Sequence, residues 1–126
     1  MSAPVPTDIK LQKASRTLRL TYANGQTYVL SAEYLRVHSP SAEVRGHGTP
    51  VLQTGKINVG LTGLAPVGNY ALKLVFDDGH DTGLYSWDYL YDLAVHQSQR
   101  WQAYLDQLQA ARASRDPHVS AVKLVP

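Results

Sequence analysis

Hydrophobic and polar residues alternate in two short stretches near the N-terminus, 18–22 and 26–30, which flank the pair Asn24-Gly25. Alternation with a period of two is typical of half-buried strands. Asn-Gly predicts a tight turn between them, because both residues tolerate a positive φ. We therefore expect a β-hairpin, followed by a short helix over 32–36 that Ser31 caps with its hydroxyl.

A second alternating region follows in the middle of the chain. Residues 57–61 and 69–76 both alternate, and the turn sequence Asp77-Asp78-Gly79-His80 is followed by a returning strand over 82–85. These segments predict a second hairpin of the same kind. In the 69–76 strand, four residues share the face that we expect to lie in the core: Tyr70, Leu72, Leu74 and Phe76.

The last third of the chain changes to a helical period. After Ser86, a predicted N-cap, apolar residues recur in steps of three and four up to about Arg112, which predicts one amphipathic helix or two in series. A single helix of that span is about 39 Å long at 1.5 Å per residue, so its second half is expected to project beyond the sheet. The fold class expected is α+β: a small antiparallel sheet built from two hairpins, one short helix and a long C-terminal amphipathic helix.

The 126 residues predict one domain with a core of its own. We expect residues 1–8 to form a flexible tail, residues 9–112 the folded domain with its extended helix, and residues 113–126 a C-terminal tail.

Composition excludes several classes of protein. The chain has no cysteine, which rules out disulfides, thiolate metal sites and cysteine nucleophiles. The net charge of +2 comes from scattered basic residues, so no nucleic-acid partner is expected. No apolar run is long enough to span a bilayer and no signal peptide is recognisable, so we expect a cytoplasmic protein without a membrane partner.

Between the two hairpins, residues 37–54 are rich in Ser, Pro, Gly and His and show no periodicity. A loop this long inside a compact domain is usually functional. It is preceded by Leu35-Arg36 and contains Pro40, and Tyr85-Ser86-Trp87-Asp88 follows downstream. Together with the Gly79-His80 turn, this combination resembles the N-terminal domain of gamma-butyrobetaine hydroxylase and the small stand-alone bacterial proteins of the same family.

The resemblance implies a zinc site that this chain has lost. In the family, Cys-Pro-Cys, a third Cys three residues later and a downstream His bind one structural zinc. The corresponding positions here are Ser39, Ser41 and Val44, while the His is retained as His80. Serine binds soft divalent metals poorly and valine not at all, so we expect the site to be degenerate.

An alternative metal site uses imidazoles alone. His38 precedes the first lost ligand, His47 follows the last, and His80 is the retained one. If the loop keeps the family's path, the three could converge as ligands for zinc or another divalent metal. The competing interpretation is that loop histidines are simply solvated.

Other candidate residues favour structural roles over catalysis. Asp77, Asp78, His80 and Asp81 could form a carboxylate–imidazole acid–base group, but they also suit a turn with capping carboxylates. Tyr85 and Trp87 are expected in the core.

Trp101 and Tyr104, on the projecting part of the helix, are the better candidates for a protein interface.

Enzyme motifs are missing from the sequence. It contains no dinucleotide-binding fingerprint, phosphate-binding loop or nucleophile elbow. The resemblance implies that the iron and 2-oxoglutarate chemistry of the hydroxylase resides in a separate barrel, which we do not expect within these 126 residues. The sequence is therefore interpreted as a non-catalytic accessory or interaction module with a protein partner. The alternative is a His-based metal-binding protein linked to an iron-dependent oxygenase or to iron–sulfur cluster metabolism, and a third is an unrelated enzyme.

Overall fold

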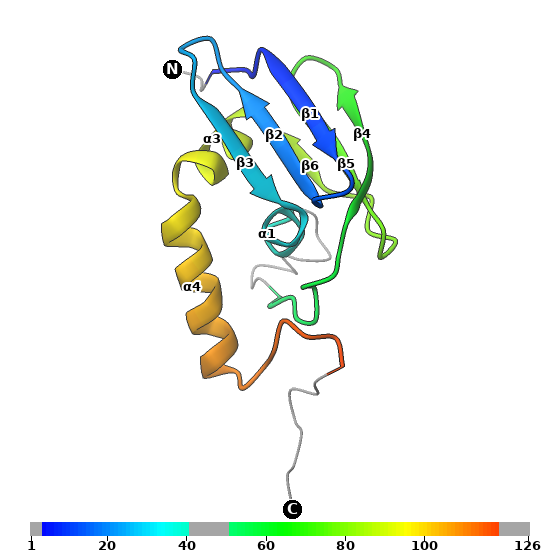
Figure 1. Ribbon diagram of the computed structural model, residues 1–126, viewed down its shortest axis with the longest axis vertical. Coiled ribbons are helices and arrows are strands. Elements are labelled where there is room, and N and C mark those ends of the chain that lie inside the picture. The colour runs from blue at the N-terminus through cyan, green and yellow to red at the C-terminus, as the bar shows by residue number, and fades with distance from the viewer. Residues whose placement is uncertain (1–3, 41–50, 119–126) are drawn as a thin grey trace, which may run out of the picture.

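The computed structural model describes residues 4–40 and 51–118, which form two small antiparallel sheets and three helices. The first sheet has the order β1-β2-β3 and the second the order β4-β5-β6. Figure 1 shows the two sheets stacked, with α1 below them and α4 running beside α1 away from the sheets. The α+β class expected from the sequence is confirmed, although the strands divide between two sheets.

The first sheet contains the predicted Asn-Gly hairpin. Strands β2 (Thr17–Thr21) and β3 (Thr27–Ser31) pair through Leu20↔Tyr28, and Gly25 in the turn has φ 88°. Strand β1 (Asp8–Gln12), which the sequence analysis did not identify, adds to the other side of β2. The sheet buries Leu18, Leu20 and Leu30 completely.

The second sheet corrects two expectations. The strand expected at 57–61 is a turn, in which Val59 N–H donates to the carbonyl of Lys56, and strand β4 runs instead over Leu61–Val67. Strand β5 (Ala71–Phe76) pairs with β4 on one side and with the short β6 (Leu84–Ser86) on the other. Tyr70 precedes β5 and is 61% exposed, so it is not a core residue.

The inner residues of the two sheets form one core. Leu72, Leu74 and Phe76 of β5 lie in the same apolar cluster as Leu18 and Leu20 of β2. Burying each side chain of this size contributes about 1.5–3 kcal/mol to folding. The core therefore joins the two hairpin regions into one domain.

Each of the two shorter helices begins at a serine. Helix α1 (Ala32–Val37) has Ser31 as its N-cap, whose hydroxyl accepts from Tyr34 N–H at 3.0 Å. Helix α3 (Trp87–Val95) has Ser86 as its N-cap, whose hydroxyl accepts from Tyr89 N–H at 3.1 Å. Both caps were predicted.

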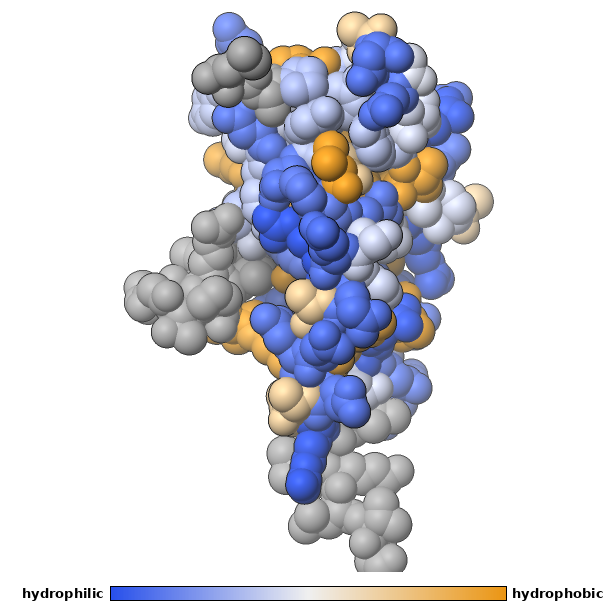
Figure 2. All heavy atoms as spheres, turned by 90° about the vertical axis from the view of Figure 1, so that its left-hand side faces the viewer, coloured by the Kyte–Doolittle hydropathy of each residue, from blue (hydrophilic) through white to orange (hydrophobic). Residues whose placement is uncertain are grey.

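The C-terminal helical region consists of two helices in series. Helix α4 (Gln97–Ala110) starts after a break at His96, which makes no side-chain cap of its own. Its Tyr104 and Leu108 pack with Val37 in a second, smaller apolar cluster. The projecting helix is therefore held against α1, and the α3–α4 side of the molecule is mostly hydrophilic with separate apolar patches (Figure 2).

The chain turns back after α4. Gly55 N–H donates to the carbonyl of Ser114 at 2.9 Å, and the guanidinium of Arg115 donates two hydrogen bonds of 2.7 Å to the carboxylate of Glu33 in α1. Arg115 also lies over the ring of Trp101 at 5.0 Å. Residues 113–118, expected in a C-terminal tail, thus connect α4 to α1. No helix within the described ranges is long and apolar enough to cross a membrane.

Candidate functional site

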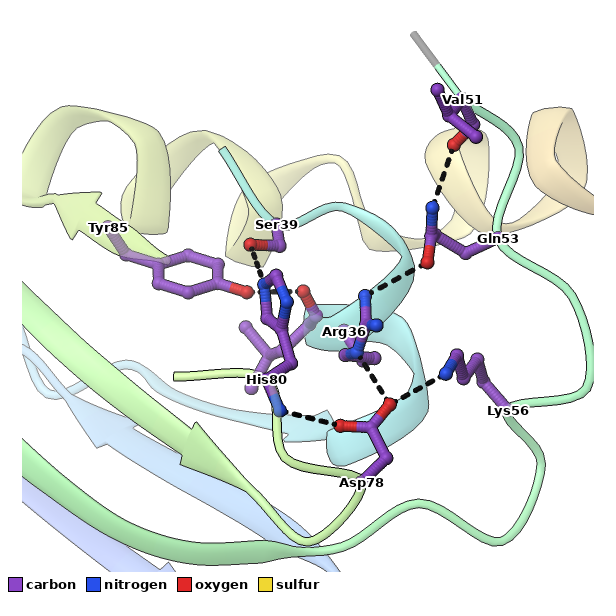
Figure 3. Close-up of polar contacts among 9 residues, drawn as sticks. Arg36, Ser39, Val51, Gln53, Lys56, Asp78, His80 and Tyr85 are labelled. Carbon is purple, nitrogen blue, oxygen red and sulfur yellow. Dashed lines mark hydrogen bonds and ion pairs between the residues drawn. The ribbon is translucent and has the colours of Figure 1, made fainter. Parts of the chain in front are cut away.

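His80 forms a hydrogen bond with Ser39, for which the resemblance implied a lost zinc-ligand position. Ser39 follows the C-cap of α1, and His80 follows the turn that ends β5; Ser39 Oγ and His80 Nε2 are 2.8 Å apart (Figure 3). Ser39 is 1% exposed and His80 3%. A Cβ atom on Gly83 would lie 2.5 Å from Ser39 Oγ, so the β5–β6 loop closes tightly over the pair. The Ser39–His80 pair is thus a buried hydrogen bond between two segments 41 residues apart in sequence.

The structure describes only one of the other candidate ligand positions. Ser41, Val44 and His47 fall outside the described residues. His38 is described and does not accompany His80: its Nδ1 lies 2.8 Å from the carbonyl oxygen of Tyr34, and its ring packs against the Tyr34 ring at 4.7 Å. Burial lowers the pKa of His38, which favours the neutral imidazole.

Two tyrosine hydroxyls donate hydrogen bonds to backbone carbonyls at the end of α1, where the loop begins. Tyr85 of β6 donates from its hydroxyl to the carbonyl of Leu35 at 2.5 Å, and Tyr89 of α3 donates to the carbonyl of His38 at 2.5 Å. Tyr85 is completely buried, and burial raises the pKa of its hydroxyl far above the usual range. These bonds satisfy carbonyls at the C-terminal end of α1, which the helix itself leaves without partners. Tyr85 is therefore a core residue, as expected.

The carboxylate of Asp78 connects three segments. Its Oδ2 accepts from Arg36 Nε at 2.9 Å and from Lys56 Nζ at 2.7 Å, and its Oδ1 accepts from His80 N–H at 3.2 Å. Burial by itself raises the pKa of Asp78, but the hydrogen bonds from Lys56, His80 and Arg36 lower it to about 2. Arg36 also donates to Gln53 Oε1 at 3.1 Å (Figure 3). With Gly79 at φ 90° in the turn, the Asp-Asp-Gly-His sequence serves as a structural junction.

The chemistry open to these residues is limited by burial. A serine hydroxyl within 2.8 Å of an imidazole is the arrangement of a nucleophile and its general base. A substrate must reach the serine oxygen, however, and Ser39 exposes only 1% of its surface. Across residues 4–40 and 51–118, no three His, Cys, Asp or Glu side chains lie together as metal ligands. The pair is suited to holding the loop in place.

An open groove of about 760 Å³ lies beside this junction. Its walls are the end of α1, residues 51–53 and one face of α4, and its lining includes Val37, His38, Leu52, Arg100, Ala103 and Tyr104. Ligand sites in proteins commonly have volumes of about 300–1,000 Å³. The groove is therefore large enough for a small molecule or a short peptide.

Two residues of α4 that the sequence analysis expected at an exposed interface are buried or partly buried. Tyr104, expected at an exposed interface, is 3% exposed and donates from its hydroxyl to the carbonyl of Gln53 at 2.6 Å. Trp101 is partly buried beneath Arg115. The small residues Ala103 and Ala110 are exposed and line the groove instead. Their spacing of seven residues was the only available signal, and it does not distinguish a groove from an ordinary solvated face.

Comparisons with known proteins agree with the residue-level resemblance. The sequence profile of the gamma-butyrobetaine hydroxylase-like, N-terminal family matches residues 9–91. Two proteins with NMR solution structures are 60% and 58% identical, with TM-scores of 0.83 and 0.78; each comparison covers 98% of this chain and, respectively, 98% and 95% of the other. A crystal structure of a DUF971-family protein with unknown function from Acidithiobacillus ferrooxidans is 38% identical with a TM-score of 0.62. No curated protein matches the chain.

The family profile does not include α4. The family profile ends at residue 91, before α4 begins at Gln97. The match to the Acidithiobacillus protein covers 98% of that protein but only 74% of this chain. The matches to the two NMR structures each cover 98% of this chain. One wall of the groove thus lies beyond the residues that the family profile matches.

Proposed function

Because the chain belongs to the gamma-butyrobetaine hydroxylase-like N-terminal family, we propose that it is a non-catalytic accessory module that binds a protein partner. The observation that carries the proposal is the contrast between the loop and the groove. The polar side chains at the start of the loop bond to other parts of the same chain, whereas α4 forms one wall of a groove whose described lining includes exposed small residues.

The loop residues support the fold. Ser39 bonds to His80, Arg36 to Asp78, and Tyr85 to the end of α1. Each buried polar group satisfied in this way avoids a desolvation penalty of about 1–3 kcal/mol. Such a network stabilises one arrangement of the chain and leaves the adjoining surface for recognition.

The α4 face supports a role in binding. Ala103, Gln107, Ala110 and Ala111 line the groove and are exposed, although they lie on the side of the helix that faces the domain. Covering apolar surface removes it from water, which favours association. A partner that covers this face therefore gains from the small side chains, which allow close approach.

Site-specific photocrosslinking in an extract of the native host tests the proposal. A small diazirine amino acid at position 107, close in size to the native Gln107, lines the groove, whereas the same residue at position 109 replaces Gln109 on the exposed opposite face. We expect one protein to crosslink at position 107 and not at 109, and an excess of the unmodified chain to suppress the product. An Ala103→Trp competitor, with its groove filled, should fail to suppress it. Equal labelling at both positions, or none at 107, would contradict a partner site on this face.

A further inference from the structure

The groove beside α4 has a charged end and an apolar end. Arg100 and Ala110 lie on the same side of the helix, ten residues apart, so the groove extends about 15 Å along α4 at 1.5 Å per residue. An extended peptide advances about 3.3 Å per residue. Four to five residues of a partner therefore match the length of the groove.

Positive charge lies at the end near α3. The guanidinium of Arg100 lies 5.8 Å from the centre of the Tyr89 ring and forms an ion pair with Asp92 through Nη2. Arg100 lines the groove, whereas Asp92 lies outside its lining. A guanidinium carries five N–H donors, so its other edge is available for a second carboxylate.

The remaining lining is apolar or neutral. Val37, Leu52 and Ala103 supply apolar walls, and the ring of His38 packs near that of Tyr104 with centroids 6.3 Å apart. Among the described residues that line the groove, none is an aspartate or glutamate. The electrostatic complement of this lining is an apolar ligand with a negative charge near one end.

We propose that the groove binds an extended, apolar segment of a partner protein whose carboxylate pairs with Arg100. This inference rests on the proposed function and adds the chemistry of the partner. The apolar side chains of the segment lie along Val37, Leu52 and Ala103, and an Asp, a Glu or a C-terminal carboxylate lies against the guanidinium.

Selection of random heptapeptides displayed on phage against the full chain tests the proposal. We expect the selected peptides to combine apolar residues with Asp or Glu and to lose binding to the groove-filled Ala103→Trp variant. Replacing the acidic residue of a selected synthetic peptide by its amide should weaken binding to the wild-type chain about tenfold, as measured by calorimetry. Amide chemical-shift changes on binding should map to Val37, Leu52 and Ala103.

Two variants isolate the role of Arg100. Arg100→Gln should bind the acidic peptide and its amide equally, because the neutral side chain cannot distinguish them. Asp92→Asn removes the same ion pair but keeps the guanidinium, so this control should retain the preference for the acidic peptide. Thermal melts of both variants confirm that they are folded.

The possible outcomes distinguish the inference about the ligand's chemistry from the proposed partner-binding function. Peptides that bind at the groove without preferring acidic residues would overturn the inference and leave a partner-binding groove in place. Absence of any peptide that distinguishes the wild-type chain from Ala103→Trp would overturn the inference, and the crosslinking experiment would decide the proposed function independently. Concentration-dependent dimerisation abolished by Ala103→Trp would assign the groove to a second copy of the chain and contradict the inference.

Discussion

The hydrogen bond between Ser39 and His80 joins two segments that lie 41 residues apart in the sequence. A buried hydrogen bond contributes about 0.5–1.5 kcal/mol net, whereas burying a large apolar side chain contributes about 1.5–3 kcal/mol. Leu35 and Tyr85, which are joined by a hydrogen bond of their own, are both completely buried. The bond therefore determines local position more than global stability.

Removing the serine hydroxyl tests this assignment. Ser39→Ala leaves the imidazole of His80 without this bond in a buried position, so we expect the free energy of unfolding to fall by about 1–3 kcal/mol. Urea unfolding measures the change. Ser98→Ala, at an exposed position in α4, is the matched control and should change stability by less than about 0.5 kcal/mol. Equal effects of the two substitutions would show that the Ser39–His80 bond contributes nothing.

Asp78 makes the protein sensitive to acid. Its pKa is lowered from the ordinary value of 3.8 to about 2 in the folded chain, so the ionised carboxylate stabilises the fold above pH 3.8. That contribution is lost as the pH falls from about 4 towards 2, since the unfolded chain takes up a proton that the folded chain resists. We expect Asp78→Asn to lower the melting temperature at pH 7 and to reduce its dependence on pH between 4 and 2. Parallel wild-type and variant curves in that range would contradict the role of Asp78.

Individual side chains show where sequence patterns succeed and fail. The caps Ser31 and Ser86 were predictable because capping depends on the residue and its immediate neighbours. Tyr70 was placed in the core by alternation, yet it follows Gly68 in the β4–β5 turn, where the strand period does not apply. The contacts of Arg36 with Asp78 and of Arg115 with Glu33 join residues 42 and 82 positions apart. No local spacing indicates such pairs.

At the scale of elements, turn chemistry was more informative than alternation. Asn24-Gly25 and Asp78-Gly79 form positive-φ turns as expected, with Gly25 at 88° and Gly79 at 90°. Strand β4 was missed because Pro66 is unfavourable in a strand interior. The sheet order places β4 at an edge, where a missing N–H is tolerated. An edge position is a property of the whole sheet and cannot be derived from the strand alone.

The C-terminal end of α4 contains a residue that is poorly suited to its conformation. Arg112 has φ 54°, and the N–H groups of Arg112 and Ala113 donate to the carbonyls of Gln109 and Leu108 in a Schellman arrangement. Glycine adopts this conformation without a Cβ penalty, so we expect Arg112→Gly to raise the free energy of unfolding by about 0.5–1 kcal/mol. Ala103→Gly, within the same helix, should instead lower it by about 1 kcal/mol. A loss of stability in both variants, measured by urea unfolding, would contradict the assigned helix end.

At the scale of the whole molecule, stability should not depend on a bound metal. The chain has no cysteine, and the described part of the loop junction is held by hydrogen bonds and ion pairs. We expect excess EDTA to leave the melting temperature unchanged within about 1 °C, and added zinc to do the same. A fall of several degrees on chelation would support the alternative site built from His38, His47 and His80.

The assembly of α4 with the rest of the molecule has a consequence for the order in which the protein matures. A ribosome releases residues from the N-terminus onwards, and domains begin to fold as soon as they are complete. The segments of both sheets have been synthesised by residue 86, but the ion pair that fastens α4 to α1 needs Arg115. The core also needs Leu90, Leu93 and Ala94 of α3, so the groove beside α4 depends on residues further along the chain than the core does. A chain that ends before Arg115 lacks the ion pair to Glu33, and we expect the region after α4 to be held less firmly against α1 in such a chain.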